Sequence, residues 1–226
     1  EIANAIVEKL KVQLGAKAGQ PLVKRYTENP EAHSAYLKGR FHLYRMSPDE
    51  LEKGRAYLEQ CVKLEPGYAP AWVLLADYYI GGTFFAQGPP RELWLKAKEC
   101  AQRAVAADPD FADAHTAVGY TAALCDFRWD EALGRFDTAL RLNPASARTH
   151  YLRSQVLFHS GRGPEGVVSG QRAVDLDPLD ALYGSVLGLC LVLLGEPARA
   201  ADHAAQVLEI DPHSPTAKCV LGIGFV

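Results

Sequence analysis

The side chains that could catalyse a reaction or hold a metal ion are seven histidines and five cysteines, which are scattered along the chain. A metal site needs several ligands at short, fixed spacings, so that their donor atoms converge on one ion. No histidine stands at such a spacing from a cysteine, a glutamate or another histidine on one helix face. We therefore expect neither a metal site nor a bound cofactor.

One segment, at residues 159–166, is rich in glycine and reads His-Ser-Gly-Arg-Gly-Pro-Glu-Gly. A phosphate-binding loop would end in Lys-Ser or Lys-Thr and would follow a strand, and this segment lacks both features. The chain also has no Gly-x-Ser-x-Gly motif and no paired cysteine and histidine that would indicate a catalytic nucleophile. These patterns predict a turn at residues 159–166 and a protein that is not an enzyme.

The balance of charge gives no sign of a nucleic-acid partner, whose phosphates would call for a basic face. The chain has 24 basic and 27 acidic residues, for a formal net charge of -3. Its cysteines are odd in number and include no close pair, which favours free thiols in a reducing compartment and hence a cytoplasmic location. No run of about 18 apolar residues is present, so no membrane span is expected.

A short sequence motif that ends in proline recurs along the chain and marks the structural elements that must position these side chains. Pro109, Pro144, Pro178 and Pro212 follow one another at intervals of 35, 34 and 34 residues. Self-similarity at such a period indicates a stack of identical supersecondary units rather than one globular core. The same pattern ends at Pro66, and the tenth residue after each of these five prolines is small, as a close helix–helix crossing requires. These small residues are Ala76, Gly119, Ser154, Gly188 and Gly222.

Apolar residues between the repeated positions follow helical spacing, and turn signals such as the one at residues 194–197 divide each unit into two helices. The units resemble the tetratricopeptide repeat, and His115 and His150 stand at its Trp-like position, where we expect interior packing residues. The resemblance implies an all-α, right-handed α-α superhelical solenoid. The residues that carry it are Trp72, Leu75, Tyr79, Gly119, Ala132, Phe136, Ala139, Pro144, Leu187, Gly188, Gly195, Ala200 and Pro212.

We assign residues 30–226 to the repeat domain, as five hairpins and a final single helix. Residues 1–14 carry an apolar stripe, which predicts an amphipathic helix that could be the tail of an upstream domain, and residues 15–29 are predicted to be a linker. The chain begins at Glu1 without a methionine, so we expect a piece of a longer protein. The passage into the first hairpin is similar to the repeat region of multidomain bacterial signalling and regulatory proteins.

In the tetratricopeptide family the first helices of the units build a concave groove, and the resemblance implies that this groove binds a peptide or helix of a partner protein. Aromatic side chains in a concave surface supply much of the binding energy. An open alternative is that these side chains pack on each other or on the helix at residues 1–14. The implied groove residues are Val73, Asp77, Thr116, Tyr120, Tyr151, Gln155, Phe158, Leu182, Leu189 and Val192.

Two other segments are candidates for contact with another molecule. Phe84 and Phe85 lie in an insertion that lengthens the second unit, where they either pack on a neighbouring hairpin or meet a partner, and where a small-molecule pocket is a third alternative. Leu221, Phe225 and Val226 end the solenoid without the polar cap that its last apolar face needs. The alternative function is therefore an oligomerisation module, a homodimer joined through this end.

Overall fold

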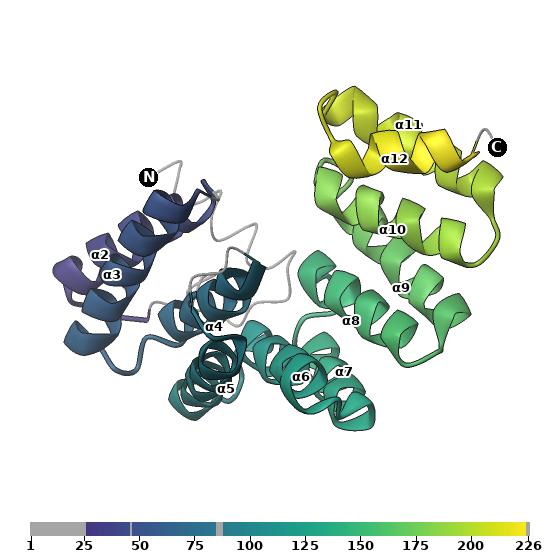
Figure 1. Cartoon of the computed structure of the whole chain (residues 1–226). Coiled ribbons are helices and arrows are strands. Elements are labelled where there is room, and N and C mark those ends of the chain that lie inside the picture. The colour runs from purple at the N-terminus through teal and green to yellow at the C-terminus, as the bar shows by residue number, and fades with distance from the viewer. Residues whose placement is uncertain (1–25, 46, 85–87, 225–226) are drawn as a thin grey trace, which may run out of the picture.

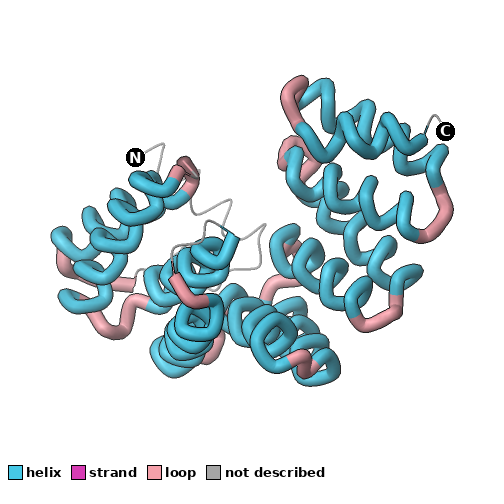
Figure 2. The backbone as a smooth tube through the Cα atoms, viewed as in Figure 1, coloured by secondary structure: helices cyan, strands magenta, loops and turns pink. Residues whose placement is uncertain are grey.

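The computed structural model describes residues 26–45, 47–84 and 88–224, and every regular element within these ranges is a helix (Figure 2). The helices follow one another as five hairpins and a last single helix. They are α2 (Pro30–Leu43), α3 (Pro48–Leu64), α4 (Ala69–Phe84), α5 (Pro90–Ala107), α6 (Ala112–Asp126), α7 (Trp129–Leu142), α8 (Ala147–His159), α9 (Gly163–Leu176), α10 (Ala181–Leu193), α11 (Pro197–Ile210) and α12 (Pro215–Gly224).

The hairpins stack side by side into an open arc (Figure 1). Consecutive helices pair within each hairpin, from α2 with α3 to α10 with α11. First helices of neighbouring hairpins also touch, as α4 does with α6 and α6 with α8. The first hairpin and α12 lie at the two tips of the arc (Figure 1). The predicted fold class, an all-α superhelical solenoid of helix hairpins, is confirmed.

The local sequence explains where the helices begin. A proline occupies the first turn of α3, α5, α9 and α11, where its missing N–H leaves no helical hydrogen bond unmade. Side-chain caps start three other helices, since Asn29, Ser146 and Asp180 accept backbone N–H groups from the first turns of α2, α8 and α10. Each cap satisfies donors that have no partner within the helix.

For Pro66, Pro109 and Pro144, the proline carbonyl oxygen accepts a hydrogen bond from the side chain six residues further on. Trp72 donates its Nε1–H to the carbonyl oxygen of Pro66 at 2.8 Å. His115 Nε2 lies 2.7 Å from the carbonyl oxygen of Pro109, and His150 makes the corresponding contact at 3.4 Å. Because a carbonyl oxygen only accepts, Nε2 carries the proton in both histidines. The two histidines thus hold the Trp-like position, as predicted.

Gly119 shows why the repeat needs a small residue where helices cross. A methyl group added there would come within 2.9 Å of the Ala132 carbonyl oxygen and 3.0 Å of the Phe136 ring, both on α7. Gly188 occupies the same repeat position with more room, since its nearest new neighbour would be Val220 at 3.4 Å. The requirement for a small residue is therefore strict in the third hairpin and relaxed in the fifth.

The turn inside a hairpin passes through a residue with left-handed backbone. Gly161, with φ of 80°, and Gly195, with φ of 76°, take this conformation in the fourth and fifth hairpins, where glycine meets no steric penalty. In the third hairpin Phe127 takes it, with φ of 54° and a side chain that is 66% exposed. An L-residue with a Cβ is strained there by roughly 1–2 kcal/mol. The third hairpin therefore presents an aromatic side chain on a strained turn.

The apolar interior is distributed along the arc rather than gathered at one centre. One cluster of buried side chains joins α2 to α6, a second surrounds Phe136 between α6 and α8, and a third joins α9 to α12. Such burial between neighbours is typical of a solenoid.

Among the described residues, no helix combines the length and the apolarity that crossing a membrane needs. The helix predicted at residues 1–14 and most of the linker predicted at 15–29 lie outside the described residues.

Candidate functional site on the concave face

A cavity of about 490 Å³ is lined by the first helices of the second to fifth hairpins, by the end of α2 and the start of α3, and by the connection between α9 and α10. Residues that are far apart in the sequence, such as Tyr44 and Tyr183, therefore border the same hollow. Its lining side chains include Leu43, Tyr44, Leu51, Leu74, Asp77, Tyr78, Tyr120, Arg148, Tyr151, Leu152, Asp177, Asp180, Leu182 and Tyr183. Tyrosine and leucine dominate this set, so the cavity is mostly apolar and aromatic, with a few charges.

An ion pair lies in the cavity and connects the second hairpin to the fourth. Arg148 Nη2, on α8, is 2.5 Å from Asp77 Oδ1, on α4, and the two side chains are 28% and 34% exposed. Burial raises the pKa of Asp77, an effect that Arg148 opposes without cancelling. Burial lowers the pKa of Arg148, but Asp77 and Asp113 more than offset this and leave the pKa raised. The negative charge of Asp77 and the positive charge of Arg148 thus neutralise each other within the cavity.

A row of hydroxyl, amide and ring contacts continues along the cavity wall. Tyr120 Oη donates to Gln155 Oε1 at 3.2 Å, and Gln155 Nε2 donates to Tyr151 Oη at 2.7 Å. The Tyr151 ring packs on the Tyr183 ring, with their centroids 4.9 Å apart. The row therefore links α6, α8 and α10 and fixes three aromatic side chains in place.

The tyrosine hydroxyls of this row remain protonated at neutral pH. Burial raises the pKa of Tyr120 to about 12, and Asp77 adds to the effect. Burial also raises the pKa of Tyr183 to about 12, with Asp180 as the next cause. The pKa of Tyr151 is raised as well, again mainly by burial. The row offers aromatic surface and neutral hydrogen-bonding groups, which are suited to binding.

Several of the predicted groove residues meet in this cavity. Gln155 is not part of the lining, but its side chain positions two of the tyrosines. Leu182 is the most exposed of the set, with 54% of its surface accessible. The predicted residues that line the cavity are Asp77, Tyr120, Tyr151 and Leu182.

The other predicted groove residues lie elsewhere. Val73 and Thr116 are buried, at 5% and 0% exposure, so they support the wall and present no surface to a partner. Phe158 and Val192 are half-buried against the apolar cluster that joins α9 to α12. Leu189 is 40% exposed but does not border the cavity.

Sequence reasoning missed Arg148, Tyr183 and the two aspartates of the connection before α10. Arg148 stands four residues after its repeat proline, the position that Asp113 and Leu182 hold in neighbouring hairpins, so strict counting from the proline could have found it. The ion pair between Arg148 and Asp77 could not be predicted from the repeat pattern, because the two residues belong to hairpins that are not adjacent.

The predicted contacts at the inserted loop and at the C-terminal end remain predictions. Phe85, Phe225 and Val226 lie outside the described residues, as does the side chain of Phe84. Leu221 is half-buried against the cluster that joins α9 to α12.

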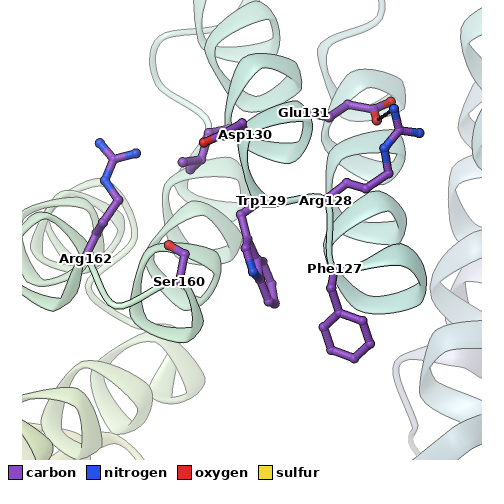
Figure 3. Close-up of a pocket in the computed structure, with 8 residues that line it drawn as sticks. Phe127, Arg128, Trp129, Asp130, Glu131, Ser160 and Arg162 are labelled. Atoms are coloured by element: carbon purple, nitrogen blue, oxygen red, sulfur yellow. Dashed lines mark ion pairs between the residues drawn. The ribbon is translucent and has the colours of Figure 1, made fainter.

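A second hollow, of about 480 Å³, lies beside the turns of the third and fourth hairpins. Figure 3 shows Phe127 and Trp129 projecting to the same side of this turn, and their ring centroids are 5.7 Å apart. The two arginines of the hollow, Arg128 and Arg162, are each paired with a glutamate three residues further on. The charges of the arginines are therefore already balanced.

Among the described residues, no group of three or more histidine, cysteine, aspartate or glutamate side chains could hold a metal ion. The five cysteines are free thiols, of which Cys219 is exposed. Burial raises the pKa of Cys61 and Cys100 to about 12, which makes both thiols poor nucleophiles.

Residues 128–181 and 171–215 match the family model of the tetratricopeptide repeat. These ranges contain the helices α7 to α11, and the described hairpins before them have the same two-helix form. Residues 128–215 therefore consist of tetratricopeptide repeats (TPRs).

Solved TPR structures share this arc. TTC0263, a thermophilic TPR protein of Thermus thermophilus, aligns with a TM-score of 0.70 at 18% identity, over 86% of this chain and 98% of its own. YrrB, described as a TPR protein with an unusual peptide-binding site, aligns with a TM-score of 0.50 at 19% identity, over 85% of this chain and 93% of its own. At these identities the likeness concerns the fold alone.

Curated relatives of this chain include the transcriptional regulator HilA of Salmonella paratyphi A, which is 27% identical over 151 residues. The match covers 66% of this chain and 27% of HilA. The chain thus spans about a quarter of the length of the curated relatives it matches.

Proposed function

We propose that this chain is a protein–protein interaction module, not an enzyme, and that its concave cavity holds a segment of a partner protein. The observation that carries the proposal is the cavity itself, to which all five hairpins contribute tyrosine or leucine side chains. TPR folds act in general as scaffolds for such contacts.

The exposed side chains of the cavity are suited to anchor a partner segment. Leu182 is 54% exposed and Tyr44 is 74% exposed, so both would lose water contact when a segment fills the hollow. The row from Tyr120 to Tyr183 is already held by hydrogen bonds and ring packing. Binding would therefore order few additional side chains, which lowers its entropic cost.

We further propose that the chain belongs to a larger bacterial signalling or regulatory protein. The support is its similarity to HilA, a transcriptional regulator in which the matched part is 27% of the length. In such an arrangement this TPR module would recruit a partner while another part of the protein acts on it.

Leu182→Glu tests the cavity directly, because it places a charge where an apolar partner side chain would sit. We expect this substitution to weaken the binding of peptides selected from a random phage-displayed library by about tenfold or more, equivalent to about 1.4 kcal/mol. Val168→Glu is the matched control, since Val168 is 72% exposed on α9 and does not border the cavity. Affinities are measured by fluorescence anisotropy, with circular dichroism to verify folding. Equal loss in both variants, or loss in neither, would contradict the proposal.

A further inference from the structure

The charged groups of the cavity are unevenly distributed. Its lining contains three carboxylates, on Asp77, Asp177 and Asp180, and one guanidinium, on Arg148. Arg148 is already engaged by Asp77 at 2.5 Å. The ion pairs among the described residues include neither Asp177 nor Asp180. The connection between α9 and α10 therefore gives the cavity a negatively charged end.

Aromatic rings border the same end of the cavity. Tyr183 lines the cavity together with Asp177 and Asp180, and its backbone N–H donates to the carbonyl oxygen of Asp180 at 3.2 Å. Tyr44, from the end of α2, also borders the cavity. The face of an aromatic ring attracts a cation, and a carboxylate beside it strengthens that attraction.

We propose that the partner segment presents a lysine or arginine side chain to Asp177 and Asp180, and apolar side chains to the leucines and tyrosines of the cavity. This inference rests on the proposed function of the cavity and adds a rule for its selectivity. A neutral or acidic segment would cover both carboxylates without supplying a counter-charge, and such desolvation opposes binding. Basic segments would therefore be preferred.

The chain itself supplies conservative replacements for a test. Asn143 holds, one hairpin earlier, the place of Asp177, and Ser146 holds the place of Asp180. The double variant Asp177→Asn/Asp180→Ser therefore removes both charges and keeps an oxygen that can cap α10, as Ser146 caps α8. Asp202→Asn, at an exposed position of α11, is the control that removes a charge outside the cavity.

Random peptides are selected on the full chain by phage display, and those whose binding depends on Leu182 define the cavity ligands. We expect them to be enriched in lysine and arginine relative to the unselected library. The double variant should bind these ligands about three- to thirtyfold more weakly than the parent, and Asp202→Asn should bind them as tightly as the parent. Replacing the basic peptide residue by methionine should cost the same factor in the parent and little in the double variant.

The outcomes separate this inference from the proposed function. Cavity ligands without excess basic residues, or ligands indifferent to the double variant, would overturn the inference and leave the proposed function intact. If no peptide depends on Leu182, both fail. Two further results would assign the cavity to another occupant and overturn the proposed partner. One is displacement of the ligands by a peptide of residues 1–14, and the other is a dimer in light scattering that Leu182→Glu abolishes.

Discussion

His150 illustrates how a single residue of the repeat can make stability depend on pH. Its Nε2–H is committed to the carbonyl oxygen of Pro144, and its Nδ1 has no hydrogen-bond partner among the described residues. Burial lowers the pKa of the His150 ring below its ordinary value of about 6.5. As the pH falls through this value, the unfolded chain binds a proton that the folded chain does not. The free energy of unfolding therefore decreases as the pH falls.

We expect the free energy of unfolding to drop between about pH 7 and pH 5, and His150→Trp to reduce that drop. Tryptophan keeps a ring N–H donor at this position, as Trp72 does, and does not titrate. The measurement is urea unfolding at a series of pH values, with each variant compared with itself at pH near 8. Burial also lowers the pKa of His203, so part of the pH dependence should persist. An unchanged drop in His150→Trp would contradict the assignment.

At the scale of the helices, two glycines at the same repeat position should respond in opposite ways to one added methyl group. Gly119→Ala would push a Cβ to 2.9 Å from the Ala132 carbonyl oxygen, and we expect it to destabilise the fold by about 1–3 kcal/mol. Gly188→Ala meets only ordinary contacts, from 3.4 Å upward, so the higher helix propensity of alanine should stabilise by up to about 1 kcal/mol. Urea unfolding of the pair measures the difference, and equal effects would refute the crossing argument.

The helices were the most predictable part of the protein, for reasons visible in particular residues. The repeat prolines and the small residues at the crossings recur along the chain, so one hairpin identifies the next. The left-handed backbone of Phe127 could not be predicted in this way. The later hairpins have a glycine at this turn, and a phenylalanine gives no indication of a positive φ. A periodic pattern therefore predicts what the units share and cannot predict where one unit departs from the others.

At the scale of the whole molecule, the Asp77–Arg148 pair should help to set the curvature of the arc. Asp77→Asn should leave Arg148 without its main counter-charge and cost about 1 kcal/mol, and the arc should open. Glu99→Gln is the control, because Glu99 pairs with Arg103 within α5 alone. Small-angle X-ray scattering should show a larger radius of gyration for Asp77→Asn than for the parent or the control. Identical radii would rule out this role.

The site was less predictable than the fold, because it depends on how small rotations between hairpins accumulate. Helical spacing predicted that Tyr120 and Tyr151 lie on one face, and both residues line the cavity. It gave no warning that Val73 and Thr116 would be covered by their neighbours. The contact between Arg148 and the second hairpin depends on the twist of the whole solenoid, which no single repeat encodes.

The hairpins contact mainly their neighbours, and this has a consequence for how the protein is synthesised. Among the described residues, the helices of each hairpin pack mainly on those of the hairpins beside it, so a completed unit can settle on its predecessor while the ribosome is still translating the next. Maturation can then advance from the N-terminal tip without waiting for the full chain. The Asp77–Arg148 ion pair is an exception, because Asp77 is synthesised two hairpins before Arg148. This ion pair can therefore form only after the fourth hairpin has been synthesised, whereas the other hairpin contacts can form in chain order.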